Sequence, residues 1–264
     1  MTEKIRIDVA LHQRGLAASR EKARAMIMAG EVTVDGRLID KPGTRIAADA
    51  ALQIKAKPRF VSRGGEKLAG ALDDFAFDVA GMICADVGAS TGGFTDCLLQ
   101  NGADKVYAID VGYGQLDYTL RTDARVVVME RTNARYVDTL DDTIDLVVID
   151  ASFISLRILL PVIKGWLHDD SVVIPLIKPQ FEAGKGDVGK GGVVRDSEIH
   201  KRVLVDVLGF AADKGFSVEG LTRSVLKGPS GNIEFLALLR VGSGDRDVDD
   251  VDDIAQQIER IVSA

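Results

Sequence analysis

The sequence predicts an α/β protein in which a mostly parallel, seven-stranded sheet follows a small N-terminal α+β domain. Two observations favour this fold class: seven apolar runs of strand length alternate with helical patterns, and the N-terminal part differs from the rest in charge. Apolar strands that alternate with helices are typical of a parallel sheet covered on both faces. The runs are Met82–Val87, Val106–Ile109, Val126–Met129, Leu146–Ile149, Val172–Ile177, Ser217–Val225 and Ile233–Leu239.

The last two runs depart from the parallel pattern. Too few residues separate Ser217–Val225 from Ile233–Leu239 for a crossover helix, so these runs are predicted to pair antiparallel. The turn between them falls at Lys227–Gly231, where a proline and two glycines favour a reversal of the chain.

Length and composition exclude several classes of protein. The 264 residues are 46% hydrophobic and 28% charged, as in a folded chain of one large or two small domains. No apolar run approaches the roughly 18 residues of a membrane span, and the N-terminus lacks the apolar core of a secretory signal. With two cysteines and three scattered histidines, neither a disulfide scaffold nor a metal site is expected. We expect a cytoplasmic protein without membrane association or an obligate protein partner.

Charge divides the chain into two unequal parts. Residues 1–67 carry 14 Lys and Arg against 8 Asp and Glu, a net charge of +6, whereas residues 68–264 carry 19 against 32, a net charge of -13. Nucleic acid favours the basic part, because Lys and Arg displace the counterions that condense on phosphates.

The predicted domain organisation follows these shifts. Phe60 is expected to anchor the packing between the two domains. Gly244–Ile254 holds six aspartates and one arginine and is predicted to be a solvated tail or linker, whereas Ile254–Val262 has apolar residues at helical spacing. The predicted parts are a small domain at 1–58, a linker at 59–64, a large domain at 65–243, and an acidic linker with a short helix at 244–264.

Two short helices are predicted in the N-terminal domain. Asp8 is expected to cap a helix through Leu11–Gly15, with glycine just past its end. Ser19 is expected to cap a second helix over Arg20–Ala29, with an apolar stripe formed by Ala23, Met26 and Ile27.

Short strands follow the second helix. Asp35-Gly36 separates two apolar segments, Glu31–Val34 and Arg37–Ile39, and Asp-Gly between such segments is a strong hairpin signal. A further strand is predicted at Ala51–Lys55.

Basic residues surround the two predicted helices. From charge alone they could equally form a solvated face, but the wider pattern resembles the S4 RNA-binding domain over about 50 residues. Arg6-x-Asp8, Arg14-Gly15-Leu16-Ala17, Ser19-Arg20-x-x-Ala23 and Gly30-x-Val32-x-Val34-x-Gly36 form this pattern. The resemblance implies binding to structured RNA through phosphates and shape. The candidate RNA-binding residues are Arg6, Arg14, Arg20, Lys22 and Arg24.

A glycine-rich loop follows the first strand of the large domain. Asp86-Val87-Gly88-Ala89-Ser90-Thr91-Gly92-Gly93-Phe94 lies where open parallel sheets bind ligands. Its spacing is not that of a dinucleotide fingerprint, and no P-loop lysine follows. Asp110 closes the second strand, where a carboxylate can accept hydrogen bonds from ribose hydroxyls. These features suit a cofactor with an adenosine ribose but no phosphates, such as S-adenosylmethionine. Asn133 could read the adenine edge or cap the next helix.

Four further polar residues stand at the ends of predicted elements. Lys67 opens a helical region, Asp150 ends the fourth strand, Lys178 ends the fifth and Glu234 begins the last. A lone charged residue at a strand end is more often a solvated terminus. Together with the glycine loop, however, their surroundings resemble a known family.

The chain resembles the TlyA-type ribosomal RNA methyltransferases, which join an S4 domain to an FtsJ-like ribose methyltransferase. The resemblance spans roughly residues 4–240. It rests on Ser-Arg-Gly-Gly-x-Lys-Leu from Ser62, Asp-Val-Gly-Ala-Ser-x-Gly-Gly-Phe-Thr-Asp from Asp86, Asp-x-Ser-Phe-Ile-Ser from Asp150 and Ile-Lys-Pro-Gln-Phe-Glu from Ile177. The family's fold is a Rossmann-like methyltransferase with a mostly parallel sheet.

The resemblance implies functions for individual residues. The family's catalytic Lys-Asp-Lys-Glu tetrad falls on Lys67, Asp150, Lys178 and Glu234. Its S-adenosylmethionine-binding residues fall on Asp86, Gly88, Ser90, Gly92, Gly93, Phe94, Asp110 and Asn133. The implied reaction is 2′-O-methylation of cytidine ribose in ribosomal RNA. The residues before Asp8 and after Arg240 favour the longer members of the family, which act on both ribosomal subunits.

The chemistry of this reaction assigns a task to the lysines. The enzyme must align the ribose oxygen, methyl carbon and sulfur, and must favour loss of the hydroxyl proton. Lys178 is the candidate for deprotonating or steering the hydroxyl. A neighbouring Lys67 cation would favour its action as a base, whereas Asp150 and Glu234 oppose that action and are expected to orient the lysines. Whether Lys178 is a base or a stabiliser of the alkoxide stays open at this point, and no metal is needed.

Additional RNA contacts are predicted near the tetrad. Arg63 lies in the linker. The segment 183–192, with five glycines, carries Lys185 and Lys190 and could be a mobile RNA-gripping lid or an ordinary flexible connector.

Three other functions compete with this hypothesis. A non-catalytic RNA-binding or ribosome-assembly factor would not need the tetrad. A membrane-active hemolysin would be expected to have a secretion signal or long apolar segments. An S4-bearing pseudouridine synthase would need neither the glycine loop nor the two residues at strand ends.

Overall fold

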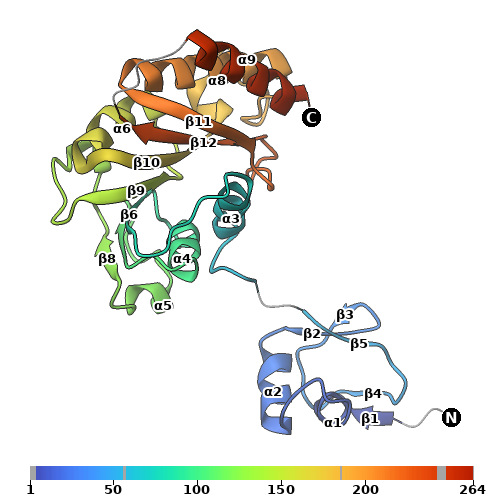
Figure 1. Ribbon diagram of the computed structural model, residues 1–264. Helices are drawn as coiled ribbons and strands as arrows, with labels where there is room; N and C mark the ends of the chain where they lie inside the picture. The colour runs from blue at the N-terminus through green and yellow to red at the C-terminus, as the bar shows by residue number, and fades with distance from the viewer. Residues whose placement is uncertain (1–3, 56–57, 185, 243–247, 264) are drawn as a thin grey trace. The chain divides into compact units, whose positions relative to one another are not determined.

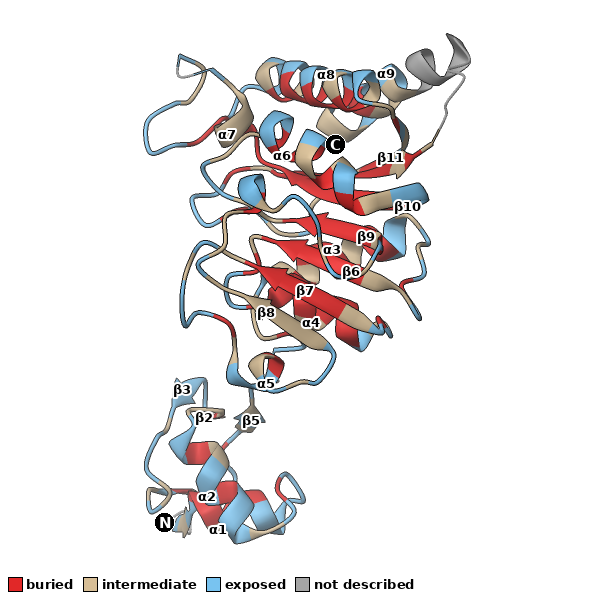
Figure 2. Ribbon diagram, turned by 90° about the vertical axis from the view of Figure 1, so that its left-hand side faces the viewer, coloured by how far each residue is buried: buried red, intermediate tan, exposed pale blue. Residues whose placement is uncertain are grey.

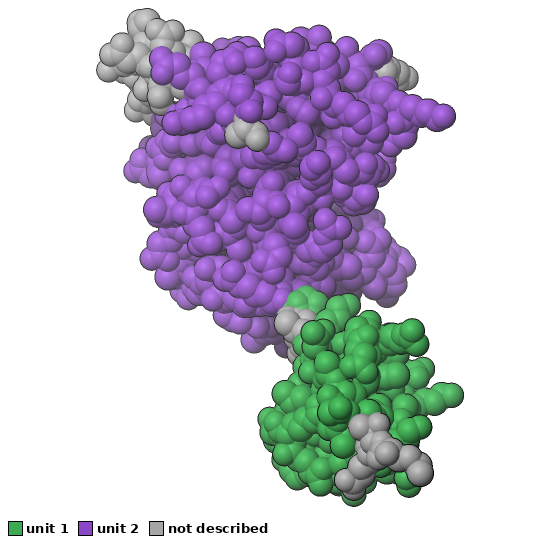
Figure 3. All heavy atoms as spheres, turned by 90° about the vertical axis from the view of Figure 1, so that its right-hand side faces the viewer, with its two compact units in different colours: residues 1–58 green, residues 59–264 purple. Residues whose placement is uncertain are grey.

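The computed structural model describes residues 4–55, 58–184, 186–242 and 248–263. The chain divides into two compact units, Met1–Pro58 and Arg59–Ala264 (Figure 3). Each unit has hydrophobic clusters of its own.

The first unit packs two helices against two small sheets. One sheet pairs β1 with β4, and the other has the order β3-β2-β5 (Figure 1). Asp35 and Gly36 both have positive φ angles, 50° and 78°, as a tight hairpin turn between β2 and β3 requires. The elements are β1 (Lys4–Arg6), α1 (Ile7–Gln13), α2 (Arg20–Met28), β2 (Val32–Val34), β3 (Arg37–Leu38), β4 (Arg45–Ala47) and β5 (Leu52–Ile54).

The two helices show one confirmed cap and one error. Ser19 caps α2 as predicted, and its hydroxyl accepts the Lys22 amide. The prediction for Asp8 is wrong: α1 begins at Ile7, and Asp8 lies buried in its first turn. The Asp8 carboxylate instead pairs with Arg6 and Arg20, and the hydrogen bond from Arg6 helps to lower its pKa to about 2. In the sequence, an aspartate that is buried in ion pairs near the start of a helix cannot be told from an aspartate that caps the helix.

The second unit contains a seven-stranded sheet with the order β11-β12-β10-β9-β6-β7-β8. Each predicted apolar run forms a strand, and β12 alone runs in the direction opposite to the other six strands. The strands are β6 (Ile83–Val87), β7 (Lys105–Ile109), β8 (Val126–Met129), β9 (Ile144–Ile149), β10 (Leu167–Ile177), β11 (Phe216–Arg223) and β12 (Phe235–Val241).

Helices cover both faces of this sheet, which explains the continuously apolar strands (Figure 2). Along β9, Val147 and Ile149 belong to the cluster that contains α6 and α8 residues, whereas Leu146 and Val148 belong to the cluster that contains α3 and α4 residues. The helical elements are α3 (Gly64–Asp74), α4 (Gly93–Gln100), α5 (Tyr118–Arg121), η1 (Ala134–Tyr136), α6 (Leu156–Ile163), η2 (Lys164–Trp166), α7 (Pro179–Glu182), α8 (Ser197–Asp213) and α9 (Val248–Ser263).

One expectation about the edges of this unit needs correction, and another stays a prediction. Phe60 is 3% exposed in the hydrophobic cluster of the second unit, with its ring against Gly65, and its expected role between the two domains stays a prediction. The expected solvated tail is partly helical, since α9 begins at Val248 and not near Ile254. Residues 243–247 of the predicted acidic linker lie outside the described residues.

Candidate active site

Four charged side chains converge at the carboxyl edge of the central strands. Lys67 extends from the first turns of α3, and Asp150 and Lys178 directly follow β9 and β10. Glu234 directly precedes β12, whose antiparallel direction brings its start to this same edge. The sheet topology therefore gathers residues that lie far apart along the chain.

These side chains form two ion pairs. Lys67 Nζ lies 2.5 Å from Glu234 Oε2, and Lys178 Nζ lies 2.6 Å from Asp150 Oδ1. Lys178 also donates to Ser152 Oγ at 3.0 Å and to the Ala151 carbonyl at 3.1 Å. Both lysines are 7% exposed, so each charge depends on its carboxylate partner for compensation.

All four residues line one cavity of about 220 Å³, hereafter the lysine cavity. Gln180, at the start of α7, supports one of them: its Nε2 donates to Glu234 Oε1 at 3.1 Å. Glu234 is thereby held by Lys67 on one oxygen and by Gln180 on the other. Sequence reasoning missed Gln180, although it lies in the quoted Ile-Lys-Pro-Gln-Phe-Glu motif.

The glycine loop approaches neighbouring backbone closely. Gly88 has a φ of 88°, and a Cβ there would lie 2.9 Å from the Asp150 carbonyl oxygen. Gly92 has a φ of 94° at the N-cap of α4. Gly93 has no room for a side chain, because a Cβ would lie 2.2 Å from Ser62 Oγ. Only glycine meets these conditions of conformation and space.

Two carboxylates organise this loop. Asp110 accepts the Ser90 amide at 2.8 Å and the Gly112 amide at 2.6 Å. Asp86 is fully buried, and its Oδ2 accepts both the amide and the hydroxyl of Thr95. The carboxylate of Asp86 thus ties the end of β6 to the first turn of α4.

The second oxygen of Asp86 is exceptional. Oδ1 is buried and has no hydrogen-bond partner among the residues that the structure describes. Burial raises the pKa of the Asp86 carboxyl to about 7; the charges of Asp150 and Asp110 add to the rise, and the hydrogen bonds from Thr95 oppose it. An unsatisfied buried carboxyl oxygen is costly and is typical of a functional site.

A second cavity of about 620 Å³, the glycine-loop cavity, adjoins the lysine cavity, since Gly88, Ser90 and Asp150 line both. Asp110 and Asn133 also line this cavity. Asn133 also caps η1 by accepting the Arg135 amide, so its interpretation as an N-cap is confirmed. Among the other predicted loop residues, Phe94 is 2% exposed in the core and reaches the lysine cavity.

A third cavity of about 360 Å³ adjoins the lysine cavity on another side and is called the aromatic cavity here. Lys178 and Glu234 line both, and Phe153 and Phe181 line the aromatic cavity, with ring centroids 4.9 Å apart. Phe153 is 90% exposed and has a left-handed φ of 63°. Such strain at an exposed aromatic residue points to function. The sequence motif around Phe153 did not by itself indicate a role for this side chain.

The predicted RNA-binding residues have varied surroundings. Arg6 and Arg20 pair with Asp8, and Arg14 donates to the carbonyls of Ala48 and Ala50. Arg63 donates to the Lys227 carbonyl. The side chains of Lys22, Arg24 and Lys190 are exposed, and Lys185 lies outside the described residues.

Comparison with known proteins identifies the family. The FtsJ-like methyltransferase family matches residues 60–241, and the S4 domain matches residues 5–51. The chain belongs to the FtsJ-like methyltransferase family. This confirms the resemblance seen in the sequence motifs, including the union of a methyltransferase with an S4 domain.

Relatives of this FtsJ-like methyltransferase match it over most of its length. Bacillus subtilis YqxC is 52% identical over 239 residues, 89% of this chain and 85% of YqxC. Mycobacterium tuberculosis TlyA, a 16S/23S rRNA (cytidine-2′-O)-methyltransferase by name, is 48% identical over 244 residues, 91% of either chain. A solved Streptococcus thermophilus structure with hemolysin in its name has a TM-score of 0.74 at 45% identity, covering 100% of this methyltransferase and 97% of that chain.

Proposed function

We propose that this protein transfers a methyl group from S-adenosylmethionine to the 2′-hydroxyl of a cytidine in ribosomal RNA. One observation carries the proposal: the two lysine–carboxylate pairs line a cavity that shares lining residues with both the glycine-loop cavity and the aromatic cavity. The glycine-loop cavity would hold the methyl donor, the lysine cavity the reacting oxygen, and the aromatic cavity the nucleobase. The names of the relatives support the choice of cytidine and of ribosomal RNA.

The residues present fit S-adenosylmethionine. Asp110 can accept hydrogen bonds from ribose hydroxyls, and Asn133 lines the part of the cavity next to it. The Asp86 carboxyl lines neither the glycine-loop cavity nor the lysine cavity and instead holds the first turn of α4 to the end of β6 through Thr95. When bound, S-adenosylmethionine supplies an electrophilic methyl group. The expectation that no metal takes part stays a prediction.

Lys178 is proposed to act on the ribose oxygen as an ammonium group. Its Nζ pairs with Asp150 and donates to Ser152 Oγ and to the Ala151 carbonyl. From this position it can donate to the hydroxyl oxygen and stabilise the developing alkoxide, while Asp150 accepts the proton. Lys67 and Glu234 line the same cavity and are proposed to hold the sugar in position for the transfer.

The aromatic cavity is proposed to receive the target base. Ribose methylation of a folded RNA requires access to one nucleotide, and unstacked bases are commonly held against aromatic side chains. Phe153 presents its ring at the entrance, beside Lys178. The S4 domain would hold the surrounding RNA through its exposed basic residues. We propose ribosomal subunits of both sizes as substrates, in the cytoplasm.

A membrane-active hemolysin is the competing function, because that word occurs in the names of relatives. Among the described residues, no helix combines the length and the apolar character needed to cross a bilayer. The ion pairs of the lysine cavity favour the methyltransferase instead. Release of dye from lipid vesicles by the purified protein would support the hemolysin.

The decisive experiment compares wild type with Lys178→Met, which keeps the length of the side chain but removes its charge. Isolated ribosomal subunits are incubated with S-adenosylmethionine labelled in the methyl group, and alkali-resistant linkages are mapped. We expect the Lys178→Met variant to methylate RNA at least 100-fold more slowly than wild type, since the amine acts on the ribose oxygen. The variant should bind the cofactor with the affinity of wild type.

Lys214→Met is the matched control, because Lys214 is an exposed lysine at the end of α8. This variant should methylate at the wild-type rate. Wild-type protein that labels neither subunit would reject the proposed function.

A further inference from the structure

Three exposed tyrosines lie in the two segments that follow β7 and β8, which also contribute residues to the glycine-loop cavity. The chain has four tyrosines, of which Tyr107 is buried in the sheet. The other three are 67%, 76% and 74% exposed, at Tyr113, Tyr118 and Tyr136 respectively. All three fall in the segments that follow β7 and β8, at the sheet edge that also carries Lys178. Large aromatic side chains clustered on a surface commonly mark an interaction site.

Arginines accompany two of these rings. Arg131 Cζ lies 4.1 Å from the centroid of the Tyr113 ring, and Arg135 Cζ lies 5.6 Å from that of Tyr136. Neither arginine forms an ion pair with a carboxylate in the described part of the chain, whereas Arg121 and Arg125 nearby do. The two guanidinium groups thus remain available for phosphates, although the second unit is acidic as a whole.

The loops that present this surface are firmly connected. The Arg131 amide donates to the Gly112 carbonyl at 2.9 Å, and the Gly114 amide donates to Glu130 at 2.8 Å. Arg131 itself has a left-handed φ of 52°, which places its guanidinium over the Tyr113 ring. An organised surface loses little conformational entropy when a ligand binds.

We infer that Tyr113, Tyr118, Tyr136, Arg131 and Arg135 form a second RNA-binding surface, the tyrosine–arginine surface, which holds single-stranded nucleotides next to the target. Tyrosine faces stack on unpaired bases without reading their sequence, and arginines neutralise the adjoining phosphates. The inference rests on the proposed function and adds a substrate contact that lies outside both the S4 domain and the catalytic tetrad.

The test measures binding of a 23S rRNA transcript to a Tyr113→Ala/Tyr136→Ala variant of the full chain. We expect the RNA dissociation constant and the KM for RNA to rise about tenfold, because base stacking on each ring is lost. The affinity for S-adenosylmethionine should stay within twofold of wild type. The matched control, Tyr113→Phe/Tyr136→Phe, keeps both rings and should bind RNA like wild type.

Salt dependence separates the two components of the surface. Arg131→Gln should reduce the slope of log Kd against log salt by about one, whereas the alanine variant should leave the slope unchanged. Unchanged RNA affinity of the alanine variant would overturn the inference, even if binding to intact subunits fell, since that would indicate a ribosomal protein partner. Loss of cofactor affinity would also overturn it. Wild type that binds neither the transcript nor isolated ribosomal subunits would instead refute the proposed function.

Discussion

Arg6 and Arg20 combine a structural task with the RNA contact predicted for them. Both pair with Asp8, which is fully buried, yet their side chains remain 46% and 52% exposed. A guanidinium group has several donors, so one edge can hold the carboxylate while another faces solvent. Loss of RNA binding on mutation of either arginine must therefore be compared with the stability of the first unit.

Asp86 leads to a prediction about pH. A carboxyl whose pKa is raised by folding stabilises the protein fully below about pH 4, and this contribution is lost as the pH rises through about 7. The Asp86→Asn variant should lack this dependence and be more stable than wild type at pH 8, by up to about 4 kcal/mol. Urea unfolding at pH 5, 6.5 and 8 measures the effect.

The same variant should bind S-adenosylmethionine more weakly, because the hydrogen bonds that join Asp86 to Thr95 in the first turn of α4 are disturbed. Asp73→Asn is the control for stability, since Asp73 is exposed on α3 and its removal should leave the pH dependence of wild type. An Asp86→Asn protein with the wild-type pH dependence would contradict the burial argument.

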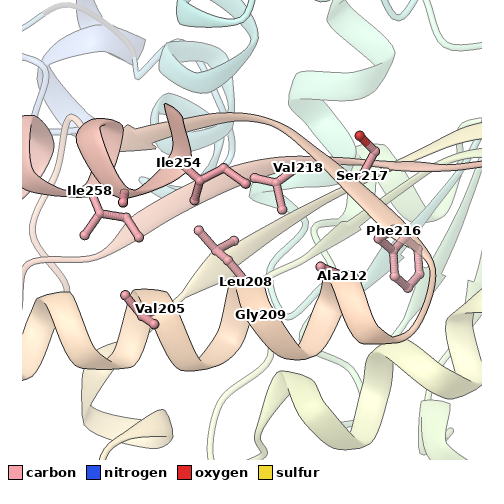
Figure 4. Close-up of a pocket in the computed structure, with 10 residues that line it drawn as sticks. Val205, Leu208, Gly209, Ala212, Phe216, Ser217, Val218, Ile254 and Ile258 are labelled. Atoms are coloured by element: carbon pink, nitrogen blue, oxygen red, sulfur yellow. The ribbon is translucent and has the colours of Figure 1, made fainter. Parts of the chain in front are cut away.

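At the scale of elements, α9 and α8 pack imperfectly against β11. An apolar cavity of about 180 Å³ separates them, lined by residues of all three elements (Figure 4). Gly209 lies in the interior of α8 at this cavity, and a Cβ there would have no atom within 4 Å. A helix glycine without steric justification weakens the helix.

Gly209→Ala should therefore stabilise the protein by about 1 kcal/mol, which corresponds to a rise in Tm of about 2–4 °C. Differential scanning calorimetry measures the change. Gly215→Ala is the contrasting variant: its φ is 81°, and a Cβ would lie 2.6 Å from Lys164 Nζ, so it should be destabilised. A Gly209→Ala variant with a lower Tm would show that the cavity has no space for the methyl group.

For the whole molecule, the separate hydrophobic clusters indicate two independent folding units. The fragment 59–264 contains both clusters of the second unit and every residue of the glycine-loop cavity. It should bind S-adenosylmethionine with wild-type affinity and lose RNA affinity at least tenfold, because the S4 domain is absent. Calorimetry with the cofactor and filter binding with rRNA measure the two effects. A fragment that binds RNA like the full chain would refute the proposed function of the S4 domain.

Local signals predicted most elements of this chain correctly. Every apolar run of the second unit is a strand, and Ser19, Asp35-Gly36 and the glycine loop lie where their backbone chemistry predicts. The errors at Asp8 and in the acidic C-terminal stretch share one cause. In each case a distant contact, or packing that nearby residues do not reveal, decides the conformation, as with the pairing of Asp8 and Arg20.

The sequence by itself therefore determined the strands, the turns, the family and the residue types of the candidate site, because periodicity and glycine conformation act over a few neighbouring residues. The tertiary structure decided how the lysines are paired, since Lys67 and Glu234 are 167 positions apart and meet only through the order of strands in the sheet. It also decided where the aromatic cavity and the tyrosine–arginine surface lie. Exposure and stacking depend on the folding of separate loops onto one edge, which no local pattern encodes.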